Sequence, residues 1–250
     1  MKKVLVGKFE AENKIEEKML LERRILLEAL QSNGIDAVNI DCKWPRDSFT
    51  SHRGEVYKRK NYGFYADGGY ILNNLEFSLA CSEVSFNEDM YIDTPEERYK
   101  LLQNLYGENV FILPPPDKSL NFNLSPHIDL VVLPIPERKL LFVDFMYYRT
   151  NHESLGLLCD KYNLTLKIVP NDYSKPSYPC NSLVLKKDNR ITVVTNNINN
   201  KGFISSLRDY GLDVIDVPFS ANCTNGGSVH CATNIIPENY IDIEGLSEID

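Results

Sequence analysis

Residues 202–218, GFISSLRDYGLDVIDVP, contain the pattern that decides the fold. Apolar residues over 202–210 have the spacing of an amphipathic helix, and a short break leads into the apolar run 212–217, which ends at Pro218. A helix joined so closely to an apolar strand can bury both apolar faces only against further elements. The pattern therefore indicates one unit of a larger α/β structure.

The same order of helix, break and strand recurs at three other places along the chain. At Thr94, a threonine N-cap, proline at the first helical position and acidic residues in the first turn favour helix initiation. The further predicted pairs of helix and strand are 15–30 with 35–41, the helix after Thr94 with 110–113, and 152–162 with 164–169. Other strand patterns lie between these units, at 130–133, 139–145, 182–186 and 190–195. The sequence thus predicts a repetitive α/β architecture.

Length and charge limit the class of protein. A chain of 250 residues can bury a sizeable core, and no stretch has the composition of a linker, so we expect a single domain over 1–250. The net charge of −8 argues against a nucleic-acid partner, because such proteins carry a clustered basic face. An acidic chain suits a cationic small ligand better.

The cysteines and the apolar segments indicate the compartment. Six cysteines in a chain of this length, with no CxxC spacing, form neither a disulfide scaffold nor a zinc site. No segment is long and apolar enough for a membrane span, so we expect a cytoplasmic protein that does not bind membranes. Nucleotide motifs such as GxGxxG are missing, so an ordinary doubly wound nucleotide-binding sheet is the weaker alternative. We expect neither a metal nor a cofactor.

One cysteine has the surroundings of a nucleophile. Cys231 ends the segment 225–231, NGGSVHC, where Gly226 and Gly227 allow the backbone to approach a ligand closely and His230 is its neighbour. The segment follows the strand that ends at Val217, and sites commonly form where strands end. The alternative is a small buried hydrophobe, which is the commonest role of a free cysteine.

Three polar signatures precede this cysteine. They are Arg46-Asp47, Asp67-Gly68-Gly69 and His127-Ile128-Asp129. Taken singly, each has an ordinary explanation: Arg46 as an ion-pair partner, either early aspartate as a turn cap, and His127 and Asp129 as loop residues. If the segment 127–129 is extended, His127 and Asp129 point to the same side.

In this order, the four signatures resemble those of the guanidine-modifying enzymes of the pentein fold. That family includes arginine deiminase, agmatine deiminase, dimethylarginine dimethylaminohydrolase and the amidinotransferases. The resemblance covers most of the chain, as far as Pro237. It implies a five-fold pseudosymmetric α/β propeller of ββαβ units. Because the interval from Asp47 to Asp67 is too short for a further helix and strand, we expect one unit to lack its helix.

The resemblance also implies roles for the signature residues. Cys231 would be the nucleophile, His127 the general acid and base, and Asp67 the residue that orients His127. Asp47 and Asp129 would bind a guanidinium, since carboxylates accept its N–H groups in the plane of the cation. The implied reaction is hydrolysis of a guanidino compound through a thiouronium on Cys231.

Two other functions remain open from the residues. An amidinotransferase shares the same residues and passes the amidino group to an amine instead of water. A non-catalytic pentein that acts as a binding module is the third alternative, although such a module has no need of Cys231 or His127.

Overall fold

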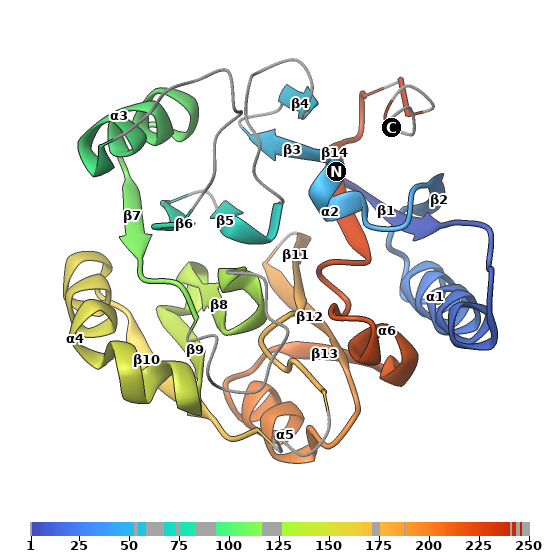
Figure 1. Cartoon of the computed structure of the whole chain (residues 1–250). Coiled ribbons are helices and arrows are strands. Elements are labelled where there is room, and N and C mark those ends of the chain that lie inside the picture. Colours follow the sequence, from blue (N-terminus) through green and yellow to red (C-terminus); the bar gives the residue numbers. More distant parts are fainter. Residues whose placement is uncertain are drawn as a thin grey trace.

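The protein forms a ring of five small sheets with its long helices on the outside (Figure 1). The structure is a computed structural model that describes residues 2–52, 55–58, 68–73, 76–83, 94–116, 127–171, 176–187, 189–240, 242–243 and 246. The repetition of similar sheets around a centre confirms the predicted five-fold α/β propeller.

Three consecutive units have the complete ββαβ order. In each, the first two strands are antiparallel, and the helix returns the chain so that the third strand pairs in parallel with the second. The first of these contains β5 (Ile71–Asn73), β6 (Ser78–Cys81), α3 (Pro95–Tyr106) and β7 (Val110–Leu113). The next contains β8 (Val132–Ile135), β9 (Leu140–Asp144), α4 (Phe145–Tyr162) and β10 (Thr165–Val169). The last contains β11 (Leu183–Lys187), β12 (Arg190–Asn196), α5 (Lys201–Asp209) and β13 (Asp213–Val217).

The two ends of the chain build the N-terminal unit together. Strand β14 (Thr233–Pro237) pairs antiparallel with β1 (Lys2–Lys8), and α1 (Lys14–Ser32) leads to β2 (Ala37–Asp41), which pairs in parallel with β1. This pairing closes the ring. It also fixes the segment just before β14, which contains Cys231.

The remaining unit is reduced. It consists of the short helix α2 (Pro45–Ser48) and the antiparallel pair β3 (Phe49–His52) and β4 (Glu55–Lys58). In the described part of this unit there is neither a long helix nor a third strand. This agrees with the prediction that one unit lacks its helix.

Two predicted boundaries were wrong. Helix α4 begins at Phe145 instead of residue 152, because the Asp144 side chain accepts hydrogen bonds from the N–H groups of Met146 and Tyr147 and caps the helix there. Non-helical Asn151, at φ −129° and ψ 21°, interrupts the helix and explains why the regular pattern starts at 152.

Strand β8 begins at Val132 instead of residue 130. A 3-10 turn, η3 (Ile128–Leu130), precedes it, so Asp129 lies on a tight turn and not in an extended strand. The segment 127–129 is therefore not extended, and the same-side arrangement of an extended strand does not apply to His127 and Asp129.

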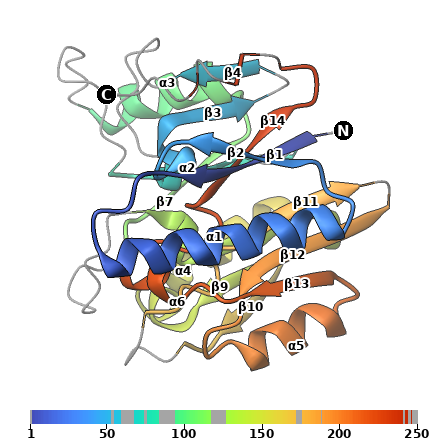
Figure 2. The same cartoon turned by 90° about the vertical axis from the view of Figure 1, so that its right-hand side faces the viewer.

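A buried polar clamp joins α1 to α6 (Ser220–Thr224), the short helix before the Cys231 segment. Glu22 accepts hydrogen bonds from the N–H of Ala221 at 2.9 Å, the N–H of Asn222 at 3.1 Å and the Asn222 amide at 2.8 Å. Beside it, Arg23 donates to Asn222 Oδ1 at 2.9 Å, and its guanidinium lies over the Trp44 ring at 4.8 Å. Figure 2 shows α1 on the outside of the molecule with α6 next to it.

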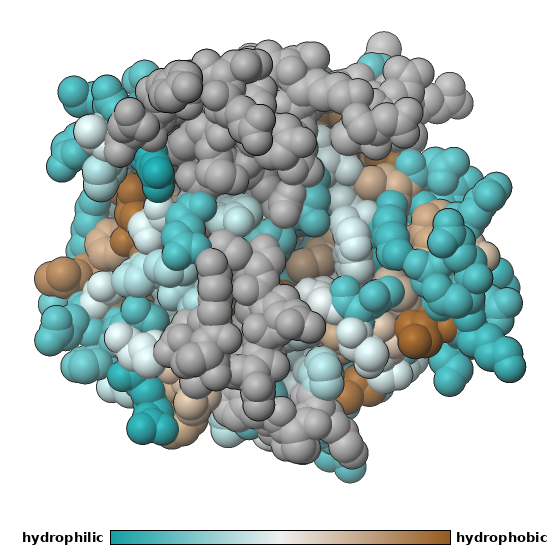
Figure 3. All heavy atoms as spheres, in the orientation of Figure 1, coloured by the Kyte–Doolittle hydropathy of each residue, from teal (hydrophilic) through white to brown (hydrophobic). Residues whose placement is uncertain are grey.

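The surface has no large apolar patch in the described part of the face in Figure 3, where hydrophobic side chains are scattered among hydrophilic ones. The exposed large hydrophobic residues among those described are Ile15 and Leu21 on α1, Phe145 and Leu157 on α4, and Ile168 on β10. Within the described residues, no helix is both long and apolar enough to span a bilayer.

The clamp predicts a stability effect at Glu22. Glu22→Ala leaves the buried N–H groups of Ala221 and Asn222 without their acceptor, so we expect the free energy of unfolding to fall by about 2 kcal/mol. Urea denaturation measures this change. Glu28→Ala, at an exposed position on the same helix, should leave the midpoint unchanged. Equal midpoints for the two variants would contradict a structural role for the clamp.

Candidate active site

Close packing around Gly227 fixes the segment that carries Cys231. A Cβ at Gly227 would lie 2.9 Å from Cys231 Cβ and 3.0 Å from the Trp44 ring, so only glycine fits without displacing one of them. The turn continues directly into β14, where Thr233 Oγ1 donates to the Val229 carbonyl at 2.8 Å. Cys231 is therefore fixed between a packed turn and a sheet.

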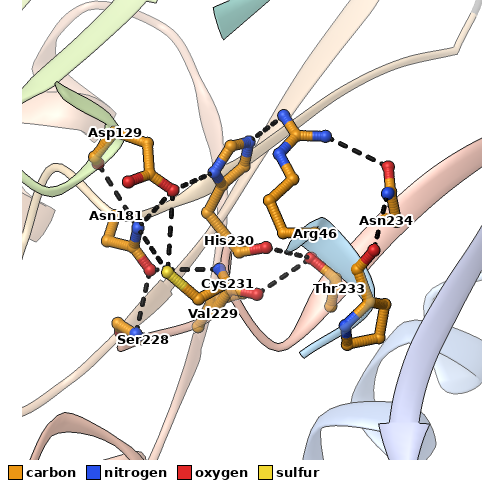
Figure 4. Close-up of polar contacts among 10 residues, drawn as sticks. Arg46, Asp129, Asn181, Ser228, Val229, His230, Cys231, Thr233 and Asn234 are labelled. Atoms are coloured by element: carbon orange, nitrogen blue, oxygen red, sulfur yellow. Dashed lines mark hydrogen bonds and ion pairs between the residues drawn. The ribbon is translucent and has the colours of Figure 1, made fainter. Parts of the chain in front are cut away.

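Asp129 lies beside this cysteine with its carboxylate almost fully buried (Figure 4). One oxygen, Oδ2, is 2.7 Å from His230 Nδ1, 2.9 Å from Asn181 Nδ2 and 3.6 Å from Cys231 Sγ. The other oxygen, Oδ1, is buried and has no hydrogen-bond partner among the described residues. The carboxylate thus has one satisfied oxygen next to the sulfur and one oxygen with unused capacity to accept a hydrogen bond.

Arg46 and Asp129 determine the tautomer of His230. The imidazole lies between them, with Nε2 facing the Arg46 guanidinium and Nδ1 facing Asp129. A guanidinium only donates, so Nε2 must accept, and Nδ1–H must donate to the carboxylate. Burial and the charge of Arg46 lower the pKa of His230 to about 4, which agrees with a neutral ring.

The same cluster sets the ionisation of Asp129. Burial acts to raise the pKa of this carboxyl, but the hydrogen bond from His230 and the nearby positive charge outweigh it and hold the pKa below its ordinary value. Arg46 is in turn held by Asn234, whose Oδ1 is 3.1 Å from the guanidinium. Asp129 is therefore ionised at neutral pH in a buried environment.

His127 lies in contact with the start of β5. Its ring packs edge-on against Tyr70, with centroids 4.9 Å apart. Gly69 lies directly against it: a Cβ there would overlap His127 Nδ1 and come within 2.9 Å of Asp129 Oδ1. The Gly-Gly signature thus provides the space in which His127 and Asp129 lie together.

The two predicted early aspartates have different outcomes. Asp47 lies on α2, close enough that its negative charge acts on both Cys231 and Arg46. Asp67 lies outside the described residues. The structure therefore brings together four of the five predicted site residues: Asp47, His127, Asp129 and Cys231.

The Cys231 thiol is protonated in the protein without ligand. Burial and the negative charges of Asp129 and Asp47 raise its pKa well above the ordinary value, although the hydrogen bond from Asn181 opposes the shift. A bound cation would neutralise those carboxylates and lower the thiol pKa. A thiol in such surroundings becomes more reactive when a cationic ligand binds.

Two residues of the cluster were not among the predicted site residues. His230 was noted only as a neighbour of Cys231, and the sequence gives no indication that it reaches Asp129. Asn181 stands alone before β11 without a motif, and only the fold shows that it touches both Asp129 and Cys231. Among the described residues, no group of three or more His, Cys, Asp or Glu side chains is arranged to hold a metal ion.

The neutral state of His230 predicts an acid-sensitive stability. In the unfolded chain this histidine takes up a proton near its ordinary pKa of 6.5, but in the folded protein only near 4. The unfolded state thus binds more protons between these values, so stability should fall from pH 6.5 to 4 by up to about 1.4 kcal/mol per pH unit. Urea denaturation at several pH values measures the slope. His230→Asn should flatten it, and an equal slope in both proteins would contradict the assignment.

The packing at Gly69 predicts a steric effect. Gly69→Ala should displace the His127 ring and lower the free energy of unfolding by about 1–3 kcal/mol. Thermal unfolding and the NMR resonances of the His127 ring report the change. Gly202→Ala, where a Cβ meets nothing within 4 Å, serves as control and should be neutral or slightly stabilising. Unchanged His127 resonances in Gly69→Ala would contradict the packing.

Solved structures match this chain over nearly its whole length. SxtG, an amidinotransferase of the saxitoxin pathway from Microseira wollei, matches with a TM-score of 0.68 at 13% identity, covering 96% of this chain and 95% of its own. The agmatine deiminase of C. jejuni matches with a TM-score of 0.65 at 12% identity, covering 94% and 92%.

A dimethylarginine dimethylaminohydrolase (DDAH) from Pseudomonas aeruginosa, in complex with citrulline, matches with a TM-score of 0.64 at 11% identity, covering 94% of this chain and 98% of its own. The sequence matches no protein-family model, and it matches no curated protein. At such identities, the likeness establishes the fold and not the reaction. The chain therefore has the pentein fold of the guanidino-modifying enzymes.

Proposed function

We propose that the protein hydrolyses a C–N bond of a guanidino compound, with Cys231 as nucleophile. The observation that carries this proposal is the buried Asp129 carboxylate, ionised and 3.6 Å from a buried thiol. A buried negative charge is costly unless a positive group compensates it. A cationic substrate bound at this carboxylate would be held next to the sulfur.

A guanidinium fits the site better than an ammonium. It is planar and presents several N–H donors in one plane, which match carboxylates on more than one side. Asp129 Oδ1 is the buried acceptor without a partner among the described residues. We assign substrate binding to Asp129 and Asp47 together.

The first half of the reaction forms a covalent intermediate. When the guanidinium binds, the Cys231 thiol gives its proton to His127, and the thiolate attacks the central carbon of the substrate, so that a C–S bond forms. His127 then gives a proton to the leaving nitrogen, and the C–N bond breaks. The products of this half are ammonia or an amine and a thiouronium on Cys231. We assign the orientation of His127 to Asp67.

Water completes the reaction in the second half. His127, now neutral, takes a proton from water as the oxygen attacks the thiouronium carbon. The C–S bond breaks, and the proton taken up by His127 passes to the Cys231 thiolate, so both residues return to their starting states. The second product is a ureido compound. The steps use only Cys231, His127 and water, so neither a metal nor a redox cofactor takes part in them.

A substrate panel tests the proposal. Incubation with arginine, agmatine and methylated arginines should give a ureido product with at least one of them, and Cys231→Ser should abolish product formation. Cys159→Ser, at another free cysteine on α4, should retain it. No product with any substrate, together with a Cys231 that resists a haloacetamidine probe, would contradict the proposal. A new guanidino compound after addition of glycine or ornithine would show amidino transfer instead.

The carboxylate predicts opposite effects on binding and on thiol acidity. In Asp129→Asn, loss of the negative charge should lower the Cys231 pKa, while loss of the ionic acceptor should raise KM at least about tenfold. Steady-state kinetics and thiol titration measure the two effects. Asp160→Asn, at an exposed position on α4, is the control. An Asp129→Asn variant with unchanged KM would contradict the assignment of substrate binding.

A further inference from the structure

Asn181 joins three segments that are distant in sequence. It lies just before β11 with its side chain fully buried, and it contacts the Asp129 turn and the 228–231 segment (Figure 4). Its backbone carbonyl accepts the His230 N–H at 3.2 Å. Asn181 thus contacts both Cys231, the candidate nucleophile, and Asp129, the candidate carboxylate for substrate binding.

The orientation of the Asn181 amide follows from its partners. The N–H groups of Ser228 and Cys231 lie 2.9 Å and 3.2 Å from Oδ1, and both can only donate. The oxygen must therefore face them, and the NH₂ group must face the opposite side. On that side, Nδ2 is 2.9 Å from Asp129 Oδ2 and 3.2 Å from Cys231 Sγ.

We propose that Asn181 is a catalytic residue that donates a hydrogen bond to the Cys231 sulfur and holds that sulfur in register with the Asp129 carboxylate. This inference deepens the proposed function and rests on it, because the sulfur is the reacting atom of that reaction. The two hydrogens of one NH₂ group serve the two acceptors. The spacing between nucleophile and bound cation is thereby fixed by a single rigid side chain.

A neutral donor is suited to this place. A thiolate beside Asp129 needs stabilisation, which a hydrogen bond supplies. A lysine or arginine here would stabilise the thiolate more strongly but would also repel a cationic substrate and compete with it for Asp129. The amide of Asn181 donates without adding charge.

Other charged or titratable groups surround the thiol, and their effects must be separated from that of Asn181. They come from the 3-10 turn, α2, α1, the Cys231 segment and the residues before β11: Asp129, Asp47, Arg46, Arg23, His230 and Tyr178. Asn181 does not titrate. A substitution of Asn181 therefore changes the thiol titration without removing any of these charges.

The test is the ionisation of Cys231 in matched alanine variants. The ultraviolet absorbance of thiolate is followed against pH, and the same titration of Cys231→Ser is subtracted. Asn181→Ala should raise the midpoint by about one pH unit, since one hydrogen bond to the thiolate is lost. Asn196 is also fully buried and bonds Ser228 Oγ at 2.9 Å. Asn196→Ala should destabilise the protein and leave the midpoint unchanged.

A second variant and a second measurement test the proposal even if Asn181→Ala does not fold. Asn181→Asp keeps the acceptor for the Ser228 and Cys231 N–H groups, removes the donor and adds a negative charge, so it should raise the midpoint further than Asn181→Ala does. In the unmodified protein, the side-chain amide proton resonances of Asn181 should shift with the same midpoint as the thiolate absorbance. Resonances that do not move, or an unchanged midpoint in a folded Asn181 variant, would overturn the inference.

The outcomes separate this inference from the proposed function. The thiol titration needs no substrate, whereas the proposed function is tested by turnover. A raised midpoint without turnover of any guanidino compound supports the role of Asn181 and counts against the reaction. Turnover together with an unchanged midpoint in the Asn181 variants supports the reaction and counts against the role of Asn181.

Discussion

The negative charge of Asp129 is the feature on which the rest of the site depends. Its carboxylate is almost fully removed from water, and such a charge persists only where donors and positive groups surround it. His230 and Asn181 donate hydrogen bonds to one oxygen of the carboxylate. Arg46, on the far side of the His230 ring, supplies a positive charge nearby. Burial and this charge together raise the pKa of the Cys231 thiol and keep it protonated. In the proposed reaction, a cation bound at the other oxygen neutralises this charge, so substrate binding and the activation of Cys231 are coupled.

The fold brings these groups together from separate units. Asp129 lies on the turn before β8, Asn181 lies before β11, and Cys231 lies before β14, so equivalent ends of strands from different sheets converge. The pairing of β14 with β1 closes the ring and anchors the Cys231 segment. At the other end of the Cys231 segment, Glu22 and Arg23 of α1 bind α6 through hydrogen bonds. The reduced unit around β3 and β4 contributes α2, which carries Asp47.

The repeat was predictable because helical and strand periodicities are local and a few strong caps mark them. Thr94 is the predicted N-cap and also forms a capping box with Glu97, and the predicted pairs of helix and strand are all present. The start of α4 was missed because the Asp144 cap precedes an interruption at Asn151. The roles of His230 and Asn181 could not be predicted, because their contacts join residues 50 or more positions apart and no local pattern encodes them.

The most direct measurement is mass spectrometry of the acid-quenched reaction. The protein is mixed with each guanidino substrate, stopped during turnover and digested, and the peptide that contains Cys231 is weighed. The coupled carboxylate and thiol predict that this peptide gains the mass of the substrate less the ammonia or amine that has left, and that Asp129→Asn shows less of this adduct at the same substrate concentration. A substrate that is consumed without any adduct at Cys231, or with an adduct at another cysteine, would contradict the account.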